Sequence, residues 1–363
     1  MSLFDINFDR PPYRAEKREK DETLTRQLSM LTQYHRERCR SYDGILSAYG
    51  YDNEEVTHYS DLPFLPSGLF KRLSLSSISE EESGLKTVTS SGTTGQQVSK
   101  IVLDGETRTL QQRALVSIGN DFIGKQRIPM LVIDCEKTAK GKDYFSARTS
   151  AVLGFSLFGK NRSFALNDRM ELDIPAIERF LELYGRERFL IFGVTYLIWS
   201  CICLELETRG LHMDLSNAIL IHGGGWKKLQ AESITREQFR EKLYKTCKIT
   251  RVHDYYGMAE QTGSIFMECE YGHMHCSDYS GVLLRRAKDF SLCEKGETGL
   301  IQTLSVLPLS YPGHNILTED EGVLLGEDDC KCGRKGVCFK VLGRTPHAEI
   351  RGCSDTYEES GEN

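Results

Sequence analysis

The 363-residue chain lacks the features of a membrane, secreted or nucleic-acid-binding protein. Its 46 basic and 52 acidic side chains give a net charge of −6, and no basic stripe is present that would suit a phosphate backbone. The charge-free apolar stretch at residues 189–204 is shorter than the roughly 18 residues that a membrane-spanning helix needs. The first residues contain early acidic side chains and no apolar core, unlike a secretory signal. We therefore expect a cytoplasmic protein with no membrane span and no nucleic-acid partner.

The twelve cysteines are expected to be reduced thiols, because the sequence shows no export signal. Five of them lie in apolar or helical stretches, which indicates small buried side chains: Cys39, Cys135, Cys201, Cys203 and Cys247. The other seven lie between Cys269 and Cys353, in the last quarter of the chain. This uneven distribution indicates a role for the late cysteines.

The order of patterns along the chain predicts an α/β protein in three parts. Residues 1–85 are expected to form an N-terminal helical segment packed on the core, since apolar residues recur there at three- and four-residue steps. Residues 86–345 alternate short apolar runs, glycine-rich turns and helical stretches, which is typical of an α/β core, and they become β-rich after Glu297. Residues 346–363 are expected to form a short polar tail.

A glycine- and hydroxyl-rich segment, TSSGTTG at residues 89–95, is the first motif with a chemical interpretation. Two glycines allow a tight turn whose backbone N–H groups can enclose an anion, and the hydroxyl groups add donors, as a triphosphate requires. A flexible polar surface turn is the alternative. The segment is not a Walker loop, because no Gly-Lys-Ser/Thr ending follows.

Two further motifs follow strand-like runs. In DYYGMAE, residues 254–260, an aromatic ring could stack on a base and a carboxylate could hold a metal ion through oxygen. Packing at a sheet edge and a carboxylate favoured by a helix dipole are the alternatives. In HGGGWKK, residues 222–228, three glycines permit close approach of a planar ligand or of another chain segment.

Together with Thr318-Glu319-Asp320 and Gly343-Arg344, these loops resemble, in the same order, the motifs of the adenylate-forming enzymes. The runs PFLPSGLFK, LIHGGGWKK, SYPGHNILTEDEG and EIRGCSDT resemble more closely the LuxE-type acyl-protein synthetases, over about residues 63–357. The resemblance implies the large N-terminal α/β domain of an adenylate-forming enzyme with a β-rich C-terminal part. The mobile C-terminal lid of that superfamily is expected to be absent or vestigial.

The resemblance also implies which residues bind ATP and Mg²⁺. The phosphates would be held by Ser91, Gly92, Thr93, Thr94 and Gly95. Gly224 and Gly225 would line the adenine, and Tyr256 would stack on it. Asp320 would bind the ribose hydroxyls, Arg344 the phosphate or ribose, and Glu260 the Mg²⁺. These roles suit adenylyl transfer, which depends on positioning and charge neutralisation. One departure is Val98, which stands where the superfamily usually has a lysine, two positions before Lys100.

Cys353 is the acyl acceptor that the resemblance implies. A thiolate attacking an acyl-adenylate would form a thioester, which keeps the acyl group activated. Arg351 favours the thiolate and Asp355 opposes it. An unreactive tail cysteine is the alternative.

Two groups of late cysteines and histidines suggest a structural zinc ion. Cys330-Lys331-Cys332 forms one half-site, and the segment CEYGHMHC at residues 269–276 offers another. Resemblance to relatives of the phenylacetate–CoA ligase kind implies the ligands Cys269, His275, Cys330 and Cys332. Reduced surface thiols in a cytosolic protein are the alternative.

The expected function is ATP-dependent activation of a fatty acid, with a long chain favoured, to acyl-AMP. The acyl group would then pass to Cys353 and onward to a partner such as an acyl reductase or acyltransferase. One alternative is an acyl–CoA ligase of the phenylacetate–CoA ligase type, against which the missing lid counts. The other is a non-catalytic acyl carrier or scaffold, in which Glu260, Asp320 and the phosphate loop would be unnecessary.

Overall fold

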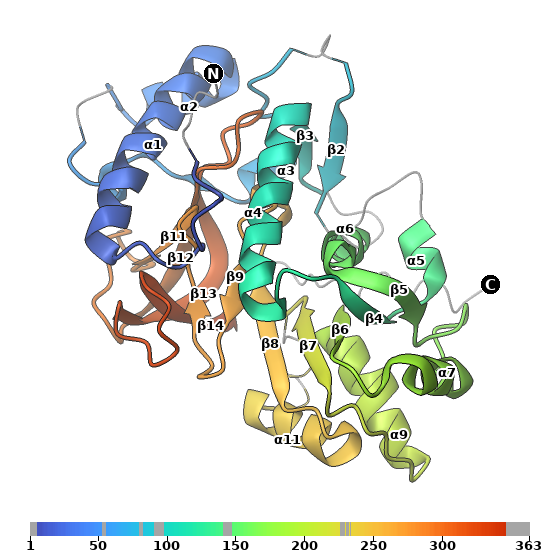
Figure 1. Ribbon diagram of the computed structural model, residues 1–363. Helices are drawn as coiled ribbons and strands as arrows, with labels where there is room; N and C mark the ends of the chain where they lie inside the picture. Colours follow the sequence, from blue (N-terminus) through green and yellow to red (C-terminus); the bar gives the residue numbers. More distant parts are fainter. Residues whose placement is uncertain are drawn as a thin grey trace. The chain divides into compact units, whose positions relative to one another are not determined.

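A computed structural model describes residues 6–52, 56–79, 83–90, 98–140, 147–225, 229, 232 and 234–345. They form two compact units, which are described separately. Unit 1 contains the described residues within 1–90, 95–118 and 257–349, and unit 2 contains those within 119–256. Figure 1 shows the elements of both units. The three-part division at residues 85 and 345 stays a prediction, and the tail after Thr345, with the expectation about a lid, lies outside the described residues.

Unit 1 contains antiparallel strands in the order β11-β12-β13-β14-β10-β9. Apolar side chains of these strands, such as Ile301, Ile316 and Phe339, are buried. Burial of one face in this way stabilises an antiparallel sheet. A short strand from the N-terminal region, β1, pairs in parallel with β13. The bounds are β1 Leu65–Pro66, β9 Phe266–Glu268, β10 Met274–His275, β11 Ser280–Arg285, β12 Thr298–Ser305, β13 Asn315–Glu327 and β14 Val337–Arg344.

The N-terminal region of unit 1 is helical. In α1 (Lys17–Arg38) the buried residues Leu24, Leu28, Leu31 and His35 recur at three- and four-residue steps, so they lie on one face of the helix. On that face, Leu24 lies against Gly281 of β11. The helices α2 (Arg40–Ala48) and α3 (Leu69–Arg72) follow, and then the hairpin of β2 (Lys86–Thr89) and β3 (Lys100–Leu103). Helix α4 (Gly105–Ile123) begins in unit 1 and ends in unit 2.

Unit 2 is built on parallel strands in the order β8-β7-β6-β4-β5. β4, β6 and β7 are nearly continuous buried apolar runs, as expected of parallel strands covered on both faces. The strands are β4 Ile128–Ile133, β5 Gly159–Phe164, β6 Phe189–Val194, β7 Ala218–Gly223 and β8 Arg251–Tyr256. The helices are α5 Glu136–Lys140, α6 Ala147–Phe155, α7 Ile174–Tyr184, α8 Thr195–Leu197, α9 Glu205–Thr208 and α11 Arg236–Cys247, with a π-helical turn at Ile198–Leu204.

Local signals explain where two helices of unit 2 begin. At the start of α11, the Thr235 hydroxyl accepts a hydrogen bond from the Gln238 N–H, and the Gln238 side chain accepts one from the Thr235 N–H. At the start of α7, Asp173 accepts a hydrogen bond from the N–H of Ala176 at 2.9 Å. Among the described residues, no helix has both the length and the apolar character needed to cross a membrane.

Candidate nucleotide and metal sites

Glu260 lies in a 3-10 turn, Ala259–Gln261, which the chain enters after β8. Its carboxylate is largely buried, and its Oε1 atom accepts a hydrogen bond from the Ser99 hydroxyl at 2.5 Å. Ser99 is completely buried and directly precedes β3. Ser99 was not predicted as a site residue, because its only sequence signal is its place just before a strand.

The backbone of the Glu260 turn is held from the loop that follows β12. The Tyr311 hydroxyl donates to the carbonyl oxygen of Glu260 at 2.9 Å, and burial raises the pKa of Tyr311, which keeps that hydroxyl protonated. The Gln261 side-chain amide donates to the carbonyl oxygens of Thr303 at 3.1 Å and Gly313 at 2.8 Å. A Cβ atom on Gly313 would lie 2.8 Å from the Glu260 carbonyl oxygen, so only glycine fits there. The turn is therefore fixed before any ligand binds.

The predicted phosphate-binding residues, Ser91, Gly92, Thr93, Thr94 and Gly95, lie outside the described residues. The two ends of that segment are described. The Ser90 N–H donates to the Ser99 carbonyl oxygen at 3.1 Å, and the Ser99 N–H donates to the Ser90 hydroxyl oxygen at 2.9 Å. The β2–β3 hairpin is therefore closed at this point, and the residue that closes it is the one that contacts Glu260.

Asp320 and Arg344, predicted from separate motifs, face each other in unit 1. They are directly paired in the register of β13 and β14, and Arg344 Nε lies 3.5 Å from Asp320 Oδ1. Thr318 supports this arrangement, since its hydroxyl accepts from the Asp320 N–H at 3.1 Å and donates to the Ile301 carbonyl oxygen at 2.7 Å. Both side chains are partly exposed, which leaves them accessible to a polar ligand.

The predicted adenine-binding residues of unit 2 follow two neighbouring parallel strands, β7 and β8. Gly224 and Gly225 have φ angles of 92° and 83°, which lie in the region that favours glycine. The Tyr255 ring lies near Phe155 and Phe192, with ring centroids 5.1 and 6.2 Å away. Tyr255 and Tyr256, the last two residues of β8, are both only partly buried. Tyr255 therefore contacts the aromatic side chains of unit 2, and Tyr256 stays the predicted stacking residue.

A buried polar cluster lies at the ends of β6, β7 and β8, next to the glycine-rich segment that follows β7. It was not predicted from the sequence. His222 Nδ1 lies 2.9 Å from the Thr195 hydroxyl oxygen and 3.6 Å from Asp254 Oδ1. The Thr195 hydroxyl donates to the Gly223 carbonyl oxygen at 3.0 Å. These contacts tie the ends of β6, β7 and β8 together where the glycine-rich segment begins.

The four predicted zinc ligands are brought together in unit 1. Their ligand atoms all lie within 4.8 Å of one another: Cys269, His275, Cys330 and Cys332. Cys269 Sγ lies 3.9 Å from Cys330 Sγ, and His275 Nε2 lies 3.3 Å from Cys332 Sγ. A zinc tetrahedron with Zn–S of about 2.3 Å and Zn–N of about 2.0 Å has S···S edges of about 3.8 Å and S···N edges of about 3.5 Å. The donor set and its spacing therefore fit zinc.

Burial sets the protonation of two of these side chains. It lowers the pKa of His275 to about 3, with a further lowering by Arg334, so the imidazole is neutral and its nitrogen can donate a lone pair. It also raises the pKa of the Cys269 thiol to about 12. A second histidine, His273, has its Nδ1 atom 3.5 Å from Cys330 Sγ. It lies at the edge of the cluster.

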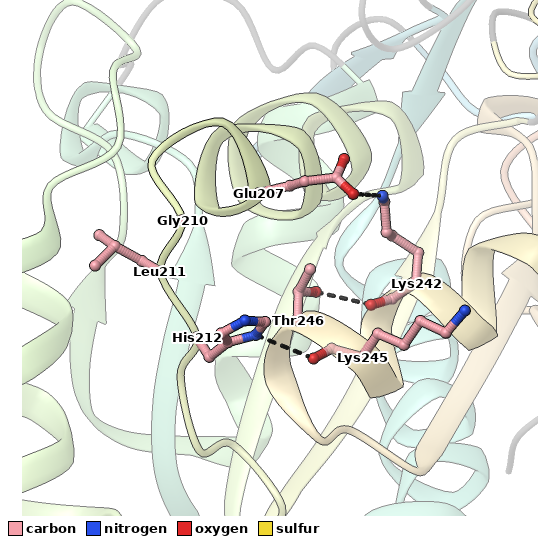
Figure 2. Close-up of a pocket in the computed structure, with 7 residues that line it drawn as sticks. All are labelled: Glu207, Gly210, Leu211, His212, Lys242, Lys245 and Thr246. Carbon is pink, nitrogen blue, oxygen red and sulfur yellow. Dashed lines mark hydrogen bonds and ion pairs between the residues drawn. The ribbon is translucent and has the colours of Figure 1, made fainter.

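A surface hollow of about 400 Å³ lies in unit 2 between α9 and α11, away from these motifs (Figure 2). Its polar groups bond to one another: the Thr246 hydroxyl donates to the Lys242 carbonyl oxygen at 2.8 Å, and His212 Nδ1 lies 3.2 Å from the Lys245 carbonyl oxygen. Lys242 also pairs with Glu207. Of the predicted site residues that the structure describes, none lines this hollow. Cys353 lies outside the described residues.

Comparisons with solved structures show which fold the chain has. The chain is similar to 2-hydroxyisobutyryl-CoA ligase in an open conformation with 2-HIB-AMP and CoA, with a TM-score of 0.71 and 12% identity, over 95% of this chain and 76% of that one. It is also similar to the same ligase in the thioesterification state, with a TM-score of 0.69 and 14% identity, over 94% and 72% of the two chains. The predicted adenylate-forming α/β fold is confirmed.

Relatives with similar sequences show the family of the chain. The long-chain-fatty-acid–luciferin-component ligase of Vibrio harveyi is 21% identical over 359 residues, which cover 96% of this chain and 91% of the relative. The protein of the same name from Aliivibrio fischeri is 22% identical over 305 residues, covering 81% and 77%. Both are ligases by name, and the prediction of a ligase is confirmed. Residues 2–360 match the family described as acyl-protein synthetase, LuxE. The chain therefore belongs to the LuxE acyl-protein synthetase family.

Proposed function

We propose that this protein activates a long-chain fatty acid with ATP to acyl-AMP and then transfers the acyl group to its own Cys353. From there the acyl group would pass to a partner such as an acyl reductase. The observation that carries the proposal is the buried Glu260 in the turn after β8, whose carboxylate accepts a hydrogen bond from Ser99 and whose backbone carbonyl oxygen accepts one from Tyr311. The family and the names of the two relatives support the same chemistry.

In the first step, a carboxylate oxygen of the fatty acid attacks the α-phosphorus of ATP. The bond from that phosphorus to the bridging oxygen breaks, and pyrophosphate leaves. Mg²⁺ would neutralise charge on the phosphate oxygens, and Glu260 offers it the hard oxygen ligand that this ion prefers. The residues 91–95 would donate backbone N–H groups to the phosphates.

The remaining nucleotide contacts come from residues that are positioned before binding. Gly224 and Gly225 let the backbone approach the adenine closely, and Tyr256 is accessible for stacking. Asp320 can accept hydrogen bonds from the ribose hydroxyls. Arg344, held beside Asp320 in the register of β13 and β14, supplies a permanent positive charge for the phosphate or ribose.

In the second step, the Cys353 thiolate attacks the carbonyl carbon of acyl-AMP, the bond from that carbon to the phosphate oxygen breaks, and AMP leaves. We further propose that Cys269, His275, Cys330 and Cys332 hold a structural zinc ion. Four protein ligands leave no open position for a substrate, which is the arrangement of structural rather than catalytic zinc.

The test combines two assays on the full chain, fatty-acid-dependent ATP–pyrophosphate exchange and covalent labelling with radioactive fatty acid. We expect exchange and a hydroxylamine-sensitive label on the wild type. Cys353→Ala should keep the exchange and lose the label, because the nucleotide-binding residues all precede Cys353 in the chain. The matched control is Cys293→Ala, a partly exposed cysteine outside the proposed sites, which should keep both.

Three results would contradict the proposal. Label retained by Cys353→Ala would place the acceptor elsewhere. Absence of exchange with every fatty acid tested would exclude activation and favour a scaffold. Formation of acyl-CoA on addition of coenzyme A, with no label on the protein, would favour an acyl–CoA ligase.

A further inference from the structure

We propose that Ser99 is a positioning residue that orients the Glu260 carboxylate for its metal ion. This inference rests on the proposed function, because it assigns Glu260 the role of metal ligand. Ser99 itself is not proposed to contact the metal or the nucleotide. It would act through Glu260.

The contact between the two side chains is direct and shielded from water. The Ser99 hydroxyl lies 2.5 Å from Glu260 Oε1, Ser99 is completely buried, and Glu260 is 7% exposed. A hydrogen bond from a hydroxyl to a carboxylate is short and strong compared with one between neutral groups. Inside the protein, where water does not compete, it fixes the rotation of the carboxylate.

Ser99 is held rigidly on its own side of this contact. Its N–H donates to the Ser90 hydroxyl oxygen at 2.9 Å, and its carbonyl oxygen accepts from the Ser90 N–H at 3.1 Å. The two residues close the β2–β3 hairpin at the base of residues 91–98. Any displacement of the hairpin base therefore displaces the hydroxyl that touches Glu260.

The backbone around Glu260 is held by other contacts. Tyr311 donates to its carbonyl oxygen, and the Gln261 side chain donates to two further carbonyl oxygens, which restrains the backbone of the turn. With the backbone fixed, the remaining freedom is rotation of the side chain. Ser99 restrains that rotation by engaging Oε1, and Oε2 would then be the oxygen offered to the cation.

A consequence for catalysis follows from this coupling. The proposed reaction requires the cation to lie at the correct distance from the phosphates. A misplacement of about 1 Å is enough to reduce a rate by roughly a hundredfold. The Ser99 hydroxyl would set the orientation of the carboxylate that holds the cation, so its loss should misplace that carboxylate.

The experiment compares Ser99→Ala with a matched control, Ser280→Ala. Ser280 is also a completely buried serine of unit 1, and its hydroxyl lies 3.1 Å from that of Ser277, far in sequence from the Glu260 turn. Both changes remove one buried hydroxyl, so their effects on folding should be similar. If Ser99→Ala does not fold, Ser99→Cys replaces it, because the thiol fills the space but is a weak donor.

Two measurements are made on each variant. The first is fatty-acid-dependent ATP–pyrophosphate exchange as a function of Mg²⁺. The second is Mn²⁺ binding, followed by electron paramagnetic resonance, to the full chain with α,β-methylene-ATP. Because a hydrogen bond to a charged group is lost, we expect Ser99→Ala to lower kcat and weaken Mn²⁺ binding by roughly 10- to 100-fold. KM for the fatty acid and the behaviour of Ser280→Ala should stay near wild type.

The outcomes separate the two proposals when Glu260→Gln is included. Loss of exchange in Glu260→Gln, with Ser99→Ala equal to Ser280→Ala in exchange and in Mn²⁺ affinity, would overturn the positioning role and leave the proposed function intact. Absence of exchange in the wild type, with Mn²⁺ binding weakened in Ser99→Ala and Glu260→Gln, would overturn fatty-acid activation and support the positioning role.

Discussion

The charge of Glu260 can be removed while the shape of its side chain is kept, by substitution with glutamine. In Glu260→Gln the amide oxygen can still accept the hydrogen bond from Ser99, but the negative charge for Mg²⁺ is lost. We expect ATP–pyrophosphate exchange to fall by a factor of roughly 100 or more, since a bound metal ion contributes several kcal/mol of transition-state stabilisation. Exchange and thermal melting should be measured on the same preparation.

A purely structural role would give the opposite pattern. If the carboxylate only favoured the dipole of its turn, the change would cost about 0.3–1 kcal/mol of stability and leave turnover near normal. Near-normal exchange with a lowered melting temperature would therefore remove Glu260 from the proposed metal site.

Residues of the candidate site differ in what their sequence context reveals. Asp320 and Arg344 were predicted as nucleotide-binding residues from two separate short motifs, and their roles stay predictions, although the register of β13 and β14 brings the two residues together. Ser99 could not be predicted, because its partner Glu260 is 161 positions away and a serine before a strand has no distinguishing pattern. Long-range contacts of single hydroxyl groups leave no periodicity in the sequence.

At the scale of elements, α1 and the loop before β13 share a pair of buried histidines. The His35 and His314 rings are stacked, with centroids 5.2 Å apart. His35 is surrounded by the rings of Tyr34 and Tyr42, Arg38 is a nearby cation, and His314 lies 2.9 Å from the Thr32 hydroxyl. Burial lowers the pKa of His314 to about 3, and burial together with the neighbouring His314 lowers that of His35.

These lowered pKa values predict a loss of stability in acid. The unfolded state binds protons below about pH 6.5, whereas the folded state resists them, so stability falls as the pH drops below that value toward the folded pKa. We expect about 1.4 kcal/mol per histidine per pH unit in that window, which is about 2 kcal/mol for His314 between pH 6.5 and pH 5. Urea unfolding at pH 7 and pH 5 measures this difference.

The variant His314→Gln should show a smaller loss between the two pH values, since glutamine does not titrate and can still bond to Thr32. The matched control is His212→Gln in unit 2, an exposed histidine, which should lose as much as the wild type. Equal losses in all three proteins would show that the buried pair is not the source of the acid sensitivity.

Elements themselves were predictable to different degrees. The buried runs FLIFG and AILIH became the parallel strands β6 and β7, because a continuous apolar run between turn residues has few other solutions. The β-rich composition after Glu297 does not show where each strand ends, and the run GVLLG is part of the 13-residue β13. β13 continues past Gly322 with a shift in register, and a Cβ there would lie 2.8 Å from the Lys340 carbonyl oxygen. A glycine that permits close packing looks in sequence like a glycine that ends a strand.

At the scale of the whole molecule, the proposed zinc ion would join parts of unit 1 that are distant along the chain. Cys269 and His275 lie on or next to β9 and β10, and Cys330 and Cys332 lie between β13 and β14. We expect about one zinc ion per chain in protein purified without chelator, measured by elemental mass spectrometry. Removal of the metal should lower the melting temperature, because the binding free energy of a structural ion is part of the folding free energy.

The control for this prediction uses two cysteines. Cys332→Ser should lose zinc and stability together, whereas Cys293→Ala, a partly exposed cysteine outside the cluster, should lose neither. Protein that contains no zinc and melts at the same temperature with and without chelator would contradict the site. The spacing of the cysteines and histidines predicted two half-sites, and the resemblance implied His275 rather than His273. The structure brings the implied four residues together, with His275 completely buried in β10.

The assembly of unit 1 from segments at both ends of the chain has a consequence for biosynthesis. Synthesis releases the chain from its N-terminus, so α1 and β1 emerge first. At that point β11, which covers Leu24, and β13, which pairs with β1, have not yet been translated. The described residues of unit 2 are consecutive in sequence and can close their parallel sheet first. Partners of α1 such as Tyr42 and Ser77 emerge soon after it, whereas Gly281, which covers Leu24, emerges more than 200 residues later. The buried face of α1 is therefore completed in two stages, first by the segment that directly follows it and last by strands near the other end of the chain.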